Sequence, residues 1–133
     1  PKNMAEVQNF MDKARLASFA TVTPDNKPHV VPVFFTYKNG KVYVQTDEFY
    51  KSSQCPKNNN VAVAVYSGEK AVIIVGKGRI IENEEEFVKR TQEHIEKYKL
   101  KIDAQGRNSL GIPLFDTRIR CVIEVIAKRI IFW

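Results

Sequence analysis

The sequence predicts an all-β protein, a closed or partly closed antiparallel barrel of six strands with two helices beside it. Three observations support this fold. Six stretches have the apolar and β-branched content of strands, turn dipeptides separate the first three of them, and only two stretches show helical periodicity. The predicted strands are Ala17 to Thr23, His29 to Tyr37, Lys41 to Thr46, Val61 to Tyr66, Ala71 to Ile81 and Ile119 to Phe132.

The first helix is predicted at the start of the chain, where Asn3 is a typical N-cap residue and Glu6 follows three positions later. Apolar side chains then recur at helical spacing, which predicts a short amphipathic helix that packs one face on the barrel. The residues of this apolar face are Met4, Val7, Met11 and Ala14.

The dipeptides Asp25-Asn26 and Asn39-Gly40 are turn signals, so the first three strands are expected to form a meander of antiparallel hairpins. The first hairpin contains "TVTPDNKPHVVPVFF", which places Pro32 inside a strand. Proline cannot donate a ladder hydrogen bond and is confined in sheets to edges and bulges. The residues alone do not explain why this strand tolerates Pro32.

The segments "VAVAV" and "AVIIV" are apolar at nearly every residue, so both faces of these strands should be covered. One face is expected to line the barrel and the other to contact a second subunit. A homodimer follows from this pattern.

The second helix is expected from Asn83, because acidic residues follow it where the helix dipole favours negative charge. Its apolar face is predicted to contain Phe87, Thr91, Ile95 and Tyr98. The two histidines, His29 and His94, are isolated in the sequence and are interpreted as surface or hydrogen-bonded structural residues rather than catalytic bases. No catalytic residue is assigned.

The chain has 133 residues, of which 44% are hydrophobic and 27% charged, and this fits one domain spanning 1–133. It contains no apolar stretch of about 20 residues and no leader pattern, so a cytoplasmic protein without a membrane partner is expected. Cys55 and Cys121 are far apart and lack nearby paired histidines, which argues against a disulfide scaffold and a metal site. The net charge of +6 favours an anionic partner, and the alternatives are nucleic acid, a phosphorylated cofactor or no specific partner.

The segment "VQTDEFYKSSQCPKNNNV" leaves the third strand and offers hydroxyl, amide and lysine side chains before the next strand begins. Such a loop can bind a phosphate through charge-assisted hydrogen bonds, or it can be an ordinary solvated loop. Gly76-Lys77-Gly78 lacks the length and context of a phosphate-binding P-loop.

In this order, the segments "FATVTPDNKPHVVPV", "KVYVQT", "VIIVGKGRII" and "CVIEVIAKRIIFW", with Lys51 ahead of "NNNV", resemble the flavin-binding split-barrel family related to pyridoxamine 5'-phosphate oxidase. The resemblance covers roughly Leu16 to Trp133 and includes the deazaflavin-using branch of the family. It implies a six-stranded antiparallel split β-barrel with flanking helices, and a homodimer with two cofactor sites at the subunit interface.

The resemblance also implies which residues bind FMN. The flavin ring would lie along Val31, Pro32 and Val33, which would explain a proline at a strand edge. Thr46, Lys51 and Ser52 would bind the phosphate, and Trp133 would complete the cofactor site. The oxidase pattern has an arginine and a lysine where Val31 and Thr36 stand here, and the C-terminal arginine and histidine segment is missing, so a substrate other than pyridoxamine phosphate is expected.

The predicted function is therefore that of an FMN-dependent oxidoreductase acting on a small molecule of unknown identity. The loop from Asp103 to Asp116 is expected to border the cofactor pocket. The first alternative is a reductase that uses the deazaflavin F420, whose acidic tail would suit the positive charge. The second is a nucleic-acid-binding barrel that stacks bases on Phe34, Phe35, Tyr37 and Tyr43, although aromatic residues in strands more often belong to a core, and no nucleic-acid partner is expected. A protein that binds flavin without turnover is the third.

Overall fold

The computed structural model describes residues 3–47 and 59–133. Every described strand begins and ends within one residue of its predicted position. None of the helices in this described part is both long and apolar enough to cross a membrane. The elements are α1 (Met4–Lys13), β1 (Ala17–Val22), β2 (Pro28–Lys38), β3 (Lys41–Asp47), β4 (Asn60–Ser67), β5 (Lys70–Ile80), α3 (Glu84–Tyr98) and β6 (Arg120–Phe132).

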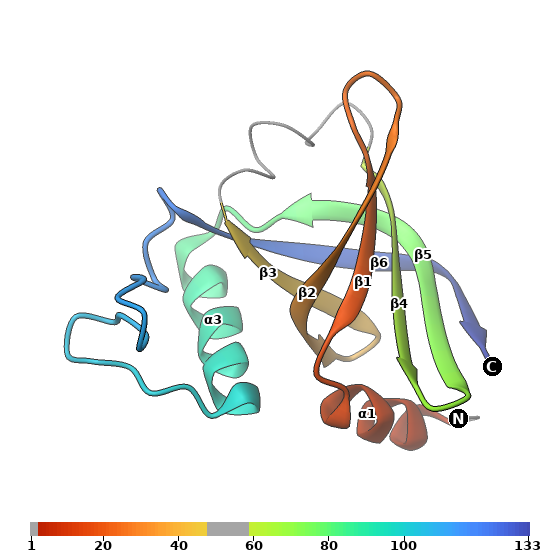
Figure 1. Ribbon diagram of the computed structural model, residues 1–133, viewed down its shortest axis with the longest axis horizontal. Helices are drawn as coiled ribbons and strands as arrows, with labels where there is room; N and C mark the ends of the chain where they lie inside the picture. Colours follow the sequence, from red (N-terminus) through yellow and green to blue (C-terminus); the bar gives the residue numbers. More distant parts are fainter. Residues whose placement is uncertain (1–2, 48–58) are drawn as a thin grey trace.

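The six strands form a closed antiparallel barrel in the order β1-β2-β3-β6-β5-β4, and β4 pairs back onto β1 (Figure 1). The two predicted hairpins β1–β2 and β2–β3 are present, and their turns contain Asn26 and Asn39 with φ of 65° and 51°. Asparagine tolerates this left-handed conformation better than most residues. The all-β class and the meander predicted from the sequence are confirmed.

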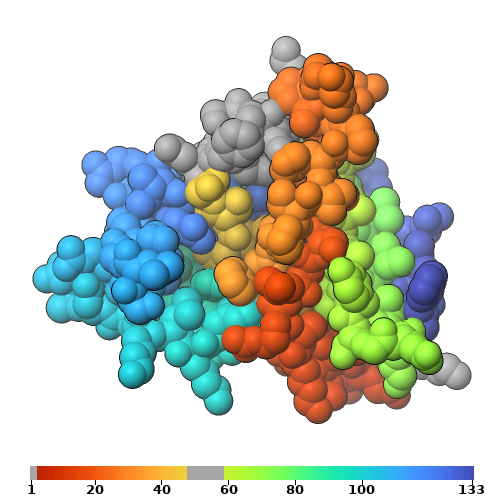
Figure 2. All heavy atoms as spheres, in the orientation of Figure 1, coloured from red at the N-terminus to blue at the C-terminus, as the bar shows by residue number. Residues whose placement is uncertain are grey.

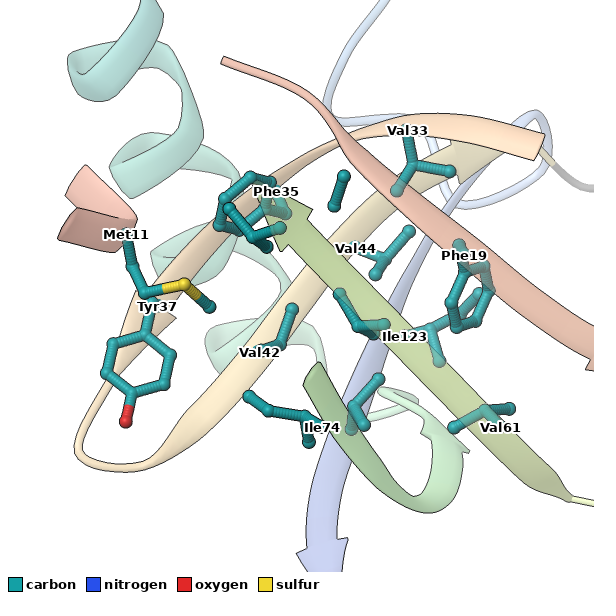
Figure 3. Close-up of a cluster of buried hydrophobic side chains, with 14 of the residues drawn as sticks. Met11, Phe19, Val33, Phe35, Tyr37, Val42, Val44, Val61, Ile74 and Ile123 are labelled. Carbon is teal, nitrogen blue, oxygen red and sulfur yellow. The ribbon is translucent and has the colours of Figure 1, made fainter. Parts of the chain in front are cut away.

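Side chains that alternate inward along the strands fill the barrel (Figure 3). The largest fully buried one is Phe35 of β2, and Met11 of α1 adds to the same cluster with no exposed surface. Burying one such side chain contributes about 1.5–3 kcal/mol. The other labelled members of this core are Phe19, Val33, Tyr37, Val42, Val44, Val61, Ile74 and Ile123.

Helix α1 begins as the sequence predicts, since the Asn3 side chain accepts a hydrogen bond from the Glu6 backbone N–H at 2.9 Å. Val7 and Met11 are buried against the barrel. Met4 is 66% exposed, so its predicted place on the apolar face is wrong. It is the first helical residue and lies beyond the part of the helix that meets the barrel.

Helix α3 is capped by Asn83, which accepts a hydrogen bond from the Glu86 backbone N–H at 2.9 Å, as predicted. Its buried residues are Phe87, Thr91, His94 and Tyr98. His94 therefore takes the inward position that the sequence assigns to Ile95. It is 5% exposed and its Nδ1 atom has no hydrogen-bond partner, which corrects the expected surface or hydrogen-bonded role.

A buried carboxylate connects α3 to the barrel. Glu124 of β6 is 2% exposed, and Arg79 of β5 donates to it with an Nη2–Oε1 distance of 3.0 Å. Arg79 also forms an ion pair with Glu86 of α3 at 3.3 Å, and Lys41 lies 3.8 Å from the second Glu124 oxygen. The first turn of α3 is thereby fixed over β5 and β6.

The segment between α3 and β6 is ordered by side chains that accept hydrogen bonds from its own backbone. The Asp103 carboxylate accepts from Gln105 and Arg107, and Asn108 accepts from Leu110 and Ile112. Figure 2 shows this segment beside α3, on the side of the molecule away from β4 and β5. That it borders a cofactor pocket remains a prediction.

Candidate functional site

The two sequence segments assigned to the cofactor meet where β2 and β3 separate. Residues 28–33 of β2 pair with β1, but β2 pairs with β3 only from Phe34 onward, where Phe34 lies opposite Gln45. Val33 and Thr46 come directly after that last pair, on strands that no longer pair with each other. We call this place the fork. It brings the predicted ring-binding segment next to the predicted phosphate-binding segment.

Pro32 lies in the half of β2 that has one free edge. It is opposite Ser18 of β1, and no described strand pairs with residues 28–33 on the other side. A strand edge is one of the few places where a sheet accommodates proline, because the missing N–H leaves no gap in a ladder there. Figure 1 shows the β1–β2 hairpin rising beyond the rest of the barrel at this edge.

The three residues assigned to the ring differ in the direction of their side chains. Val33 is 7% exposed and belongs to the barrel core, and Val31 packs against the same core (Figure 3). Pro32 alternates with them and is exposed on the outer face. Among these three, Pro32 can therefore offer a side chain to an outer ligand, while Val31 and Val33 can offer backbone atoms.

The outer face next to Pro32 is mostly apolar. Cross-strand register places Pro32, Ser18, Ala64, Ile73 and Ile131 in one row that crosses β2, β1, β4, β5 and β6. Facing residues of paired strands share one side of a sheet. Since the middle of the row has small side chains, a planar ring or a second flat surface can approach the backbone closely.

The row continues into a shallow hollow of about 350 Å³ that contains Tyr66, Ala71 and Trp133 in its lining. The Trp133 backbone N–H donates to the Ala71 carbonyl at 2.9 Å, and its side chain leaves the residue 75% exposed. Trp133 shares the outer face with Pro32 but is separated from it by β1 and β4. A single chain therefore does not bring Trp133 to the fork.

Thr46 is half-buried at the end of β3, opposite Cys121 of β6, which is buried. Its hydroxyl is the one described member of the predicted phosphate-binding set. Lys51 and Ser52 lie outside the described residues, as does Cys55.

Arg120 is a cation at the fork that the sequence analysis did not identify. It lies opposite Asp47, one pair beyond Thr46, at the start of β6. Burial lowers the pKa of its guanidinium, and the nearby Asp47 carboxylate partly offsets this effect. Its position depends on the β3–β6 register, which pairs residues 73 positions apart in the sequence and has no local signal.

Lys97 of α3 was also not identified. Its ammonium donates to the carbonyls of Met11 and Phe35, each at 3.0 Å, and lies 3.7 Å from the centre of the Phe35 ring. Burial lowers its pKa to about 8. With these contacts Lys97 connects α1, α3 and β2, which is a structural role away from the fork.

Comparison with known proteins agrees with this architecture. The sequence model of the family described as Pyridoxamine 5'-phosphate oxidase matches residues 4–125. No curated protein matches the chain by sequence. A conserved hypothetical protein from Mycobacterium tuberculosis has a similar structure, with a TM-score of 0.82 and 19% identity, over 100% of this chain and 85% of that one.

Two further similar structures are named for what they bind or store. The FAD binding protein from Mycobacterium smegmatis has a TM-score of 0.64 and 17% identity, and the match covers 98% of this chain and 95% of that one. The heme storage protein HutZ from Vibrio cholerae has a TM-score of 0.75 and 12% identity, over 96% and 92% of the two chains. At these identities the likeness concerns the fold.

Proposed function

Because the chain belongs to the pyridoxamine 5'-phosphate oxidase family, we propose that it is an FMN-binding oxidoreductase that acts on a small molecule. The observation that carries the proposal is the fork, where the edge of β2 at Pro32 lies beside the end of β3 at Thr46 in this family's barrel. We further propose one domain over residues 1–133, a homodimer, and a cytoplasmic location. Bound FMN would supply the redox chemistry, and the chain's own residues would bind and orient it.

The described residues fit a flat cofactor that carries a phosphate. Pro32 and the small residues Ser18 and Ala64 give the ring a flat surface, and the Thr46 hydroxyl can donate to a phosphate oxygen. We assign Lys51 and Ser52 to the same phosphate from the sequence. Because Trp133 lies away from the fork of its own chain, we assign it to the site of the other subunit, across the dimer interface.

The substrate is proposed to differ from pyridoxamine phosphate. Val31 packs against the core and Thr36 is 5% exposed, so neither position presents a cation or an exposed polar group. A phosphate on the substrate would need such a group to bind firmly. A small uncharged or weakly charged substrate suits this site better.

The absorption spectrum of the purified protein tests the cofactor. FMN is expected to give bands at about 370 and 450 nm, whereas a single band at about 420 nm would favour the deazaflavin F420. F420 is the second candidate because its acidic tail would suit the net charge of +6. A colourless protein that does not bind added FMN would contradict the proposal.

Of the aromatic residues named for base stacking, Phe35, Tyr37 and Tyr43 are at most 2% exposed, which weighs against the nucleic-acid alternative.

The Ile73→Lys variant tests the proposed dimer. Ile73 lies in the outer row between Ala64 and Ile131, so a lysine there would have to lose its hydration on association. We expect wild type to be a dimer and Ile73→Lys a monomer in light scattering at micromolar concentration. Gln92→Lys, on the exposed side of α3, should remain a dimer. A monomeric wild type would reject the assembly.

The Lys51→Ala variant tests the phosphate site. Hydrogen bonds to charged groups contribute roughly 1.5–3 kcal/mol, so FMN should bind the variant about 10- to 150-fold more weakly. Riboflavin has no phosphate and should bind both proteins equally. Lys89→Ala, an exposed lysine on α3, is the control and should leave both affinities unchanged. If Lys51→Ala binds FMN as wild type does, the assignment of the phosphate to this loop is withdrawn.

A further inference from the structure

Five side chains in the described part of the chain have buried polar atoms without a hydrogen-bond partner. One is Arg90, where only Nε lacks a partner and Nη1 pairs with Glu93. In the other four the atoms are both amide atoms of Gln45, Oγ1 of Thr91, Nδ1 of His94 and Nε of Arg120. Gln45 and His94 are each 5% exposed, and Thr91 has no exposed surface. Bulk water therefore does not reach the first three.

Gln45, Thr91, His94 and Arg120 lie on the parts of β3, α3 and β6 that face one another. Gln45 projects from β3 opposite Phe34, and the Phe34 ring centre lies 6.2 Å from that of His94. Thr91 is one turn before His94 on the buried face of α3. Arg120 lies on the same face of β6 as Val122, which is opposite Gln45. Its charge contributes to lowering the pKa of His94, so these two side chains are close to each other.

Leaving so many polar groups unpaired in one place would be costly. A buried donor or acceptor without a partner loses its hydration without compensation, and in native proteins most such groups bind protein atoms or ordered water. We propose an internal hydration site between α3 and β3, in which ordered water is bound by Gln45, Thr91 and His94. This inference does not depend on the cofactor.

The hydrogen-bonding groups of these side chains suit water better than a metal cation or an anion. The Gln45 amide offers a donor and an acceptor, the Thr91 hydroxyl offers both, and Arg120 adds a donor. Water can donate and accept in turn and typically makes about three hydrogen bonds in a protein interior. A metal cation would be repelled by Arg120 and by the nearby Lys97, and an anion would leave the Gln45 carbonyl oxygen unpaired.

Water is observed directly by nuclear Overhauser contacts between water and the Thr91 and Gln45 side chains in the full chain. We expect long-lived water contacts in wild type and in Thr91→Ser, which keeps the hydroxyl. Thr91→Val keeps the shape of the side chain and removes the hydroxyl, so these contacts should weaken. Equal water contacts in the serine and valine variants, or none in wild type, would overturn the proposal.

The unfolding equilibrium constant of Thr91→Val gives an independent test, because the constant should change in opposite directions with and without bound water. If the Thr91 hydroxyl binds water, Thr91→Val should raise the unfolding equilibrium constant about tenfold, because a satisfied hydrogen bond is lost. If the space is dry, the same change removes an unpaired polar group and should lower that constant. Stabilisation by added chloride or phosphate in wild type, absent in Gln45→Met, would show an anion at this place and would also overturn the proposal.

Discussion

Replacing Gly76 with alanine is expected to lower the free energy of unfolding by about 4 kcal/mol or more, in the range reserved for severe core defects. Gly76 of β5 is buried opposite Ala127, at the register shift between Val75 and Gly76. A methyl group there would fall on the carbonyl oxygen of Ile126 and lie 2.9 Å from its carbonyl carbon. Strands β5 and β6 would have to move apart at this pair.

Urea denaturation of wild type and variant measures this difference. The control is Val75→Ala on the neighbouring residue, which is 38% exposed and should cost less than about 1 kcal/mol. Loss of the folded far-ultraviolet dichroism in Gly76→Ala would agree with the prediction. A variant within about 1 kcal/mol of wild type would show that β6 can relax around the added methyl group.

Gly76 also shows what local sequence can and cannot predict about this fold. The strands were predictable because each is a short apolar run between turn residues, and Asn26 and Asn39 mark turns by their chemistry. The sequence analysis correctly concluded that Gly76-Lys77-Gly78 is not a phosphate-binding P-loop, since the motif lies within β5. It did not show why a glycine is needed at position 76. The β6 backbone approaches Gly76 closely because Gly76 pairs with Ala127, about 50 positions later in the sequence.

The fork was predictable in part. Pro32 was an unexplained feature of a strand and Thr46 marked the end of another, and the family resemblance assigned both segments to one site. Their adjacency follows from the β2–β3 hairpin, which is a local feature. Arg120 could not be placed there, because it reaches the fork through the long-range β3–β6 pairing.

The face of α3 was predicted with an error of one residue. Apolar periodicity favours Ile95, and the chain buries His94 instead, since Phe87, Thr91, His94 and Tyr98 follow a helical stripe with spacings of four, three and four. Nothing in the local sequence indicates that a polar residue such as His94 is buried within an otherwise apolar stripe. The hydration site between α3 and β3 was therefore invisible to the sequence analysis.

Acid is expected to destabilise the protein through His94, and the His94→Phe variant should lose this effect. Burial lowers the pKa of His94 to about 4, and the charges of Arg120 and Lys97 act in the same direction. In the unfolded chain the pKa of a histidine is about 6.5. Between these values the unfolded chain binds a proton that the folded protein does not, so stability falls as the pH falls.

The size of the effect follows from the difference of about 2.5 pKa units, which corresponds to about 3 kcal/mol between pH 7.5 and pH 4. A water molecule at Nδ1 of His94 would satisfy its hydrogen bond. It would not supply a negative charge, which is what would favour the protonated imidazole. Urea denaturation across this range should show that wild type loses about 3 kcal/mol more than His94→Phe, which retains a ring beside Phe34 and Tyr98. Thr91→Val is the control, since it removes no titrating group and its pH profile should run parallel to wild type. Parallel profiles for wild type and His94→Phe would mean that His94 is protonated in the folded protein as readily as in the unfolded chain.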